Sequence, residues 1–260
     1  MTEIVNSFDL KNLEQFLLIL SRMASFMSVA PIFSMGNVPV RVKLGLSVLI
    51  SGLLYGVVGY QIPEYTSLIQ YAMLVIMESV VGLLIGFGAY MCTTIVAFTG
   101  KIIDMEIGLS MAQMFDPTTK TQSSLVGTLY NYMIMVLMIM TDMHLYLLKV
   151  MADSYEIVSI GNLRINGGLY NFIFDFLAQY FMIGFKIALP VFAAMLVVNI
   201  VMGVLAKAAP QMSMFAVGIQ IKVLIGLAVV YLTATLLPDM AEMIFDEIQR
   251  VVTQVLKGMR

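Results

Sequence analysis

Side chains that could carry catalysis or bind a metal are few in this sequence and lie far apart. His144 is the only histidine and Cys92 the only cysteine, which excludes an internal disulfide and a cysteine-rich metal site. Asp104 and Glu106 lie two residues apart, so on a helix they point away from each other. Segment 86–88 lacks the third glycine of a dinucleotide fingerprint, and the chain has no Walker lysine motif. We therefore expect no catalytic residue, no metal ligand and no cofactor.

Five charged residues stand inside long apolar runs and are candidates for an ion or proton path. They are Arg22, Glu78, Asp175, Lys186 and Lys222. Each charge at the centre of a membrane helix costs about 2.5 to 3.5 kcal/mol on insertion scales, so such residues usually face protein or water. The alternatives are pairing between helices, and long side chains near helix ends that reach the interface. No two of the five form an obvious relay within one helix.

The composition places the chain in or against a membrane. Apolar residues make up 60% of the 260 residues and charged residues 12%, against about 45 to 50% and about 25% in soluble domains. The mean hydropathy is +0.95. We expect a helical membrane protein, or a subunit buried on most sides. The net charge of −2 leaves no basic stripe for phosphates, so nucleic acid is excluded as a partner.

The apolar runs predict an all-α protein with about six long helices, because several reach the roughly 20 residues that cross a hydrocarbon core. The six are expected within residues 13–33, 44–64, 65–101, 121–141, 172–206 and 212–237. The third and fifth runs exceed a simple crossing, so a tilt, a break or a projection beyond the bilayer is expected there.

Two features predict surfaces that pack against other helices. Gly52 with Gly56, and Gly82 with Gly86, have the spacing that lets helix backbones approach closely. Residues 240–256 predict an amphipathic helix, whose polar face is not strongly basic, so docking on protein is favoured over lying on lipid. The apolar stripe of that helix consists of Met240, Ile244, Ile248, Val251 and Val255.

A semi-polar segment from about Asp104 to Ser124 interrupts two apolar helices and is too long for a hairpin turn. Irregular backbone at membrane depth survives only where it is buried in protein or lines a watery cavity. Long ordered loops are often functional, and a plain surface loop is the alternative. Methionines concentrate around this segment, where their flexible side chains could form a deformable seal or serve as core filler. They are Met105, Met111, Met114, Met133, Met135, Met138, Met140 and Met143.

Several short motifs together resemble the FliR family, the R subunits of the flagellar type III export gate, whose relatives in injectisomes are the T subunits. The matching pieces follow the expected order from Arg22 to Gly218. They are Arg22 with Ala30-Pro31-Ile-Phe, Val38-Pro39-Val-Arg41, Gly108-Leu-Ser with Asp116-Pro117 and Gln122-Ser-Ser, and Lys207-Ala-Ala-Pro210-Gln211-Met with Gly218. Ser213 departs from the pattern, since the family favours Asn at this position.

The resemblance implies a non-enzymatic channel subunit in the bacterial inner membrane, within the flagellar basal body, through which unfolded flagellar subunits pass. Its implied partners are FliP and FliQ homologues in a hetero-oligomeric ring, an FlhB homologue, the exported proteins and membrane lipid. Residues 1–164 would be FliP-like, and residues 165–260 a FliQ-like helical hairpin with an amphipathic tail. The hairpin turn would contain Lys207, Pro210 and Gln211.

The same resemblance makes the segment of about 104–124 a pore plug that blocks the channel at rest. The residues carried over to the plug are Gly108, Leu109, Ser110, Met111, Met114, Phe115, Asp116 and Pro117. Two other functions remain open. One is the T subunit of a virulence injectisome. The other is a small-solute or ion transporter, which would need midplane charges arranged as a site, often in paired broken helices.

Overall fold

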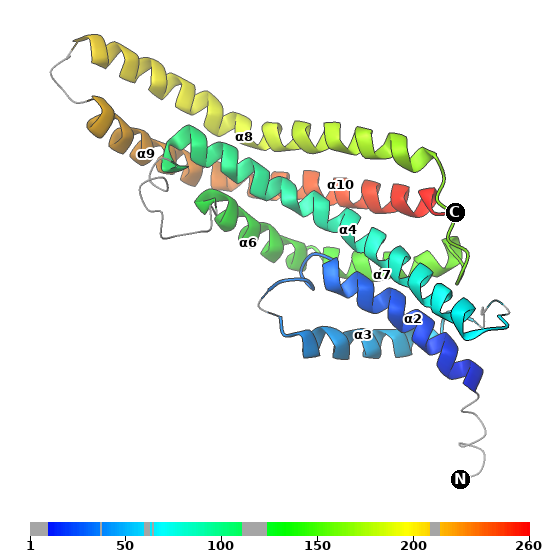
Figure 1. Cartoon of the computed structure of the whole chain (residues 1–260). Coiled ribbons are helices and arrows are strands. Elements are labelled where there is room, and N and C mark those ends of the chain that lie inside the picture. The colour runs from blue at the N-terminus through cyan, green and yellow to red at the C-terminus, as the bar shows by residue number, and fades with distance from the viewer. Residues whose placement is uncertain (1–9, 37, 60–62, 64, 111–123, 209–213) are drawn as a thin grey trace. The chain divides into compact units, whose positions relative to one another are not determined.

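The computed structural model describes residues 10–36, 38–59, 63, 65–110, 124–208 and 214–260, and these residues form an all-α protein (Figure 1). Eight α-helices and one 3-10 helix occur in this part of the chain. They are α2 (Leu10–Val29), α3 (Val40–Tyr55), α4 (Leu68–Ile107), α6 (Leu125–Met140), α7 (Met143–Ile157), α8 (Gly168–Ala208), α9 (Met214–Thr233), η1 (Ala234–Leu236) and α10 (Leu237–Gly258).

Each of the six expected long helices is present, and the expected amphipathic helix is α10. Helix α7 is an addition that the apolar runs did not predict. The uncharged run that precedes it ends at Asp142, and its own sequence carries the charged residues Lys149, Asp153 and Glu156. Its apolar side chains still lie on one buried face, which includes Met143, Leu147 and Met151, so α7 forms by packing rather than by overall hydropathy.

Helix ends differ from the expected ones where turn residues act. Helix α3 begins at Val40, because Pro39 at the N-cap position has extended backbone, and a proline is tolerated there. Helix α4 continues to Ile107, one turn beyond the expected start of the semi-polar segment at Asp104. Both Asp104 and Ile107 are buried, so this last turn of α4 belongs to the packed helix.

Among the residues that the structure describes, three stretches are long and apolar enough to cross a membrane: Leu68–Ile107, Phe172–Ala208 and Gly218–Gly258. A fourth is possible if α6 and α7 count together as one broken span. The 40 residues of α4 measure about 60 Å at about 1.5 Å per residue, twice the thickness of a hydrocarbon core. This length agrees with the expected projection or tilt.

The chain divides into two compact units that alternate along the sequence. Unit 1 comprises Met1–Cys92, Asp142–Phe176 and Glu247–Arg260, and unit 2 comprises Thr93–Thr141 and Leu177–Asp246. Helices α4, α8 and α10 therefore contribute residues to both units. This division rests on contacts within the chain, whereas the predicted boundary near residue 164 concerns likeness to other subunits and stays a prediction.

Unit 1 is held together by close packing of α2 with α3 and of α2 with α4. Helices α2 and α3 lie side by side (Figure 1). A Cβ atom added at Gly82 would lie 2.1 Å from the Arg22 carbonyl oxygen, and one at Gly86 would lie 3.0 Å from the Phe26 carbonyl oxygen. The second glycine pair of the sequence thus receives the backbone of α2, as its spacing predicts. A Cβ at Gly52 would meet nothing within 4 Å.

Unit 2 uses glycines in the same way. A Cβ at Gly100 of α4 would lie 2.1 Å from the Cα of Gly127 in α6, so the two backbones touch at this crossing. A Cβ at Gly226 of α9 would lie 2.5 Å from Ile107 at the end of α4. The last part of α4 therefore packs closely against both α6 and α9.

The amphipathic helix α10 is covered along its apolar stripe by the chain itself. Every residue of the predicted stripe is buried. The acids and bases Asp239, Glu242, Asp246 and Arg250 are exposed. The C-terminal part packs on α4, since a Cβ at Gly88 would lie 3.1 Å from Val251.

Candidate functional site: a buried ion pair and the base of the 108–124 segment

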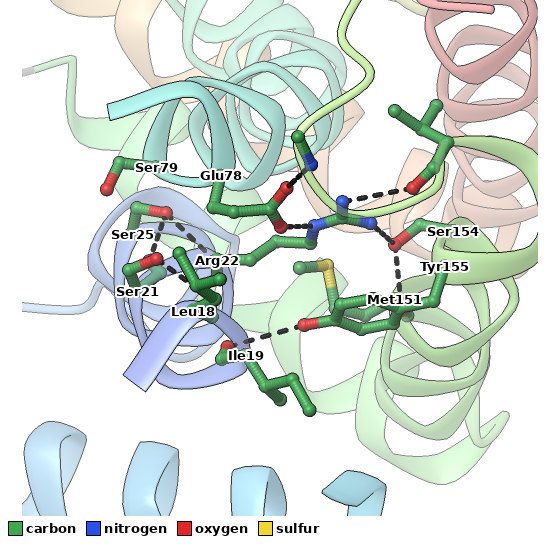
Figure 2. Close-up of polar contacts among 12 residues, drawn as sticks. Leu18, Ile19, Ser21, Arg22, Ser25, Glu78, Ser79, Met151, Ser154 and Tyr155 are labelled. Atoms are coloured by element: carbon green, nitrogen blue, oxygen red, sulfur yellow. Dashed lines mark hydrogen bonds and ion pairs between the residues drawn. The ribbon is translucent and has the colours of Figure 1, made fainter. Parts of the chain in front are cut away.

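Arg22 and Glu78, two of the five charges in apolar runs, form an ion pair inside unit 1 (Figure 2). The Arg22 Nε donates to Glu78 Oε2 at 2.6 Å, and the two side chains are 0% and 1% exposed. Arg22 lies on α2 and Glu78 on α4. The two charges therefore pair between helices, which is one of the alternatives to an ion or proton path. A buried ion pair offsets the cost of removing its charges from water only if its remaining polar atoms are also hydrogen-bonded.

The remaining donors of Arg22 are used by α7 and the chain that follows it. Its terminal nitrogens donate to the Ser154 hydroxyl at 3.1 Å and to the Val158 carbonyl at 3.0 Å. The guanidinium carbon lies 4.1 Å from the ring centroid of Tyr155, within the range of a cation–π contact. The Tyr155 hydroxyl in turn donates to the Ile19 carbonyl at 3.3 Å, so α7 is bonded to α2 at two levels (Figure 2).

The second oxygen of Glu78 is equally occupied. Glu78 Oε1 accepts from the backbone N–H of Gly161 at 2.9 Å. Gly161 has φ +74 and a Cβ there would lie 2.5 Å from Leu74, so both the conformation and the space require glycine. The network joins α2, α4, α7 and the turn after α7. Its charged groups are bonded and out of contact with solvent, which suits a structural role and offers an ion no water-filled route.

The base of the 108–124 segment lies in unit 2, where α4 ends and α6 begins. The Asp104 carboxylate accepts from the backbone N–H of Leu125 at 2.7 Å and from that of Val126 at 3.2 Å. The Ser124 hydroxyl oxygen accepts from Gly127 N–H at 2.8 Å as the N-cap of α6. Free N–H groups and the positive end of the dipole favour a carboxylate at a helix start. Here that carboxylate comes from a different helix.

Helix α4 ends at Ile107, and the next residue, Gly108, has φ +90, a conformation that glycine adopts without strain. The Lys222 side chain of α9 passes this residue, because a Cβ at Gly108 would lie 4.0 Å from Lys222 Cδ. A lysine near a helix C-terminus interacts favourably with the dipole. The structure thus brings together a predicted plug residue and one of the five charges in apolar runs.

The other predicted site residues fall into three groups. Asp175 and Lys186 are exposed on α8, and Lys207 is exposed in the last turn of that helix. Leu109 and Ser110 follow Gly108 directly and are half-buried. The predicted residues Met111, Met114, Phe115, Asp116, Pro117, Pro210 and Gln211 lie outside the described residues.

The sequence did not predict that Asp104 bonds to the start of α6. It showed only that Asp104 and Glu106 point away from each other on a helix. One signal was available. An acid in the last turn of a helix opposes the dipole of its own helix, which suggests that it serves another element. Among the described residues, no group of three or more His, Cys, Asp or Glu side chains is placed to hold a metal ion.

Comparison with known proteins gives one consistent result. The family model described as bacterial export proteins, family 1, matches residues 13–248. The flagellar biosynthetic protein FliR of Pectobacterium carotovorum subsp. carotovorum is 29% identical over 254 residues, which cover 96% of each chain. The FliR proteins of Bacillus subtilis (strain 168) and Escherichia coli (strain K12) are 28% and 25% identical, over 81% and 91% of this chain and 82% and 90% of their own.

Proposed function

The chain belongs to family 1 of the bacterial export proteins, and we infer that it is a subunit of the flagellar export gate. The observation that carries this function is the family match over residues 13–248, with FliR proteins aligned over most of their length. The long apolar helices agree with a membrane protein of the flagellar apparatus.

Within that apparatus, we propose that the chain assembles with FliP and FliQ homologues, and with an FlhB homologue alongside, in the inner membrane at the flagellar basal body. Unfolded flagellar subunits would pass through the resulting pore, and the chain would contribute no catalytic step. Large apolar side chains exposed along α3 and α8, such as Leu49, Leu53, Phe185 and Val204, support the need for neighbouring helices or lipid, since monomeric soluble proteins rarely leave such continuous surfaces open.

The proposed division of the chain assigns residues 1–164 to a FliP-like part and residues 165–260 to a FliQ-like hairpin. Helices α8 and α9 support a hairpin, because they are separated by only residues 209–213. They also approach each other beside that turn, where a Cβ at Gly218 would lie 3.1 Å from Met202 Cε.

We propose that the segment from Gly108 to Ser124 is the plug that closes the pore. The anchoring of its two ends supports this role, since Asp104 bonds the start of α6 to the end of α4. A plug fixed at both ends can block a channel without an additional partner to hold it. Its methionines, Met111 and Met114, are flexible enough to seal an irregular gap.

The plug is tested by deleting Ser110–Met114 and measuring ion conductance through the assembled gate in a lipid bilayer. We expect the complex to assemble and the resting conductance to rise, because the segment no longer fills the channel. Replacing Met111 and Met114 by Ser should raise conductance less, since the backbone still occupies the pore. Intact assembly with unchanged conductance after the deletion would show that the segment is a surface connector.

The function of the whole chain is tested by removing it from the bacterium that makes it and measuring flagellar filament protein in the medium. We expect export to stop, and the reintroduced chain to restore it. Loss of a different secreted set, with normal flagellar export, would instead indicate an injectisome T subunit. Normal export of every substrate, with altered uptake of a solute or ion, would favour the transporter alternative.

A further inference from the structure

The carboxylate of Asp104, a residue of α4, accepts hydrogen bonds from the backbone of another helix, α6. Its oxygens lie 2.7 Å from Leu125 N and 3.2 Å from Val126 N, 21 and 22 residues further along the chain, and the residue is 3% exposed. Burying a carboxylate is costly unless its oxygens are bonded. Both oxygens accept backbone N–H groups at the positive end of α6, which offsets that cost.

Capping α6 does not by itself require Asp104. The Ser124 side chain already accepts from Gly127 N–H as the local N-cap, which is the usual way to satisfy a helix start. What Asp104 adds is a connection between helices. Its bonds join the last turn of α4 to the first turn of α6, and these two turns flank the segment between the helices.

The Asp104 bonds lie beyond the point where α4 and α6 cross, so they control how far the ends of the two helices can separate. The backbones of α4 and α6 touch at Gly100 and Gly127. Asp104 lies four residues beyond Gly100, or about 6 Å along the helix at about 1.5 Å per residue. Without the Asp104 bonds, the crossing at Gly100 remains as a pivot about which the ends of α4 and α6 can separate.

We propose that Asp104 is a positioning residue of the export gate, which holds the end of α4 and the start of α6 together and thereby keeps the gate closed. This inference rests on the proposed function of the segment between the two helices as the plug. It predicts that the resting gate opens more often when the Asp104 bonds are lost, even though every residue of the plug is still present.

The test uses the assembled gate with Asp104→Ala, Asp104→Asn and the control Glu106→Gln. Glu106 has the same charge in the same turn of α4 and makes no hydrogen bond to α6 among the described residues. One readout is resting conductance. The other is the distance between spin labels at Met105→Cys and Leu129→Cys, two exposed positions on α4 and α6, in a chain whose buried Cys92 is replaced by Ala.

In Asp104→Ala we expect a longer or broader distance and a rise in resting conductance of about tenfold, the order expected for loss of charge-assisted hydrogen bonds. Asp104→Asn keeps one acceptor oxygen and should lie between Asp104→Ala and the wild type in both readouts. Glu106→Gln should match the wild type. If Asp104→Ala does not assemble, the graded response of Asp104→Asn carries the test, because a general folding defect would not raise conductance in assembled gates.

Two results would overturn the inference while leaving the plug in place. One is an unchanged distance in Asp104→Ala. The other is a changed distance with wild-type conductance, in a gate that does leak when Ser110–Met114 is deleted. If neither Asp104→Ala nor that deletion raises conductance, the proposed plug itself is wrong, and the role of Asp104 in gating fails with it.

Discussion

Replacing Glu78 by Gln is expected to destabilise the chain strongly, although the two side chains have nearly the same shape. Glu78 accepts one hydrogen bond at each carboxylate oxygen, from Arg22 Nε and from the N–H of Gly161. A glutamine amide has one acceptor oxygen, so its NH2 group must face one of these donors. The Arg22 guanidinium, which is 0% exposed, also loses its counter-charge.

The expected cost follows from burial. Removing one partner of a buried ion pair costs about 3 to 5 kcal/mol, because the other charge stays buried and unpaired. The matched control is Asp153→Asn, an exposed acid on α7, which should change stability by about 0.5 kcal/mol or less. Replacing Arg22 by Met and Glu78 by Gln together should recover much of the loss, because no unpaired charge then remains.

Cys92 provides the assay. It is the only cysteine in the chain, it is 0% exposed, and it lies in unit 1 with the ion pair. A thiol reagent should therefore label it in the assembled gate only when the chain opens. A loss of about 3 to 5 kcal/mol raises the open population by about a hundredfold or more. Labelling of Glu78→Gln at the rate of Asp153→Asn would refute the reasoning.

Three further changes test the packing. Gly82→Ala should lower the free energy of unfolding by about 1 to 3 kcal/mol through overpacking, because its Cβ would meet the α2 backbone. Gly52→Ala would meet nothing within 4 Å and should be neutral or stabilising by up to about 1 kcal/mol. Thermal unfolding of the gate compares the two variants. Gly184→Ala places a Cβ 2.6 Å from the Phe98 ring and should lower the unfolding temperature in the same assay, unlike the open site Gly203→Ala. Deleting residues 248–260 removes Val251 and Val255, which pack on α4 at Gly88, and should strongly reduce the yield of purified gate, which an unchanged yield would contradict.

The sequence predicted the structure best where the pattern lies within a single helix. The apolar runs predicted α4 and α8, and the spacing of Gly82 and Gly86 predicted a helix crossing that α2 occupies. Periodic apolar positions likewise predicted the buried stripe of α10. In each case the signal is local, because the residues that carry it are neighbours along one helix.

Contacts between distant residues could not be predicted in the same way. Arg22 and Glu78 are 56 residues apart, and the sequence showed that both are charges in apolar runs without showing that they pair. Asp104 reached α6 through a helix crossing that only the tertiary structure reveals. Helix α7 was missed because its charges hid an apolar face, a case in which packing rather than hydropathy decides the element.

The central claim, that this chain is an export-gate subunit, is tested most directly by purifying the tagged chain from its native membrane and identifying what copurifies. We predict one stable complex that contains FliP and FliQ homologues, and poor yield of the chain when it is produced without them, since its exposed apolar and glycine-lined faces need neighbours. A stable, monodisperse chain that purifies alone and gains nothing from coexpressed FliP-like and FliQ-like proteins would contradict the claim.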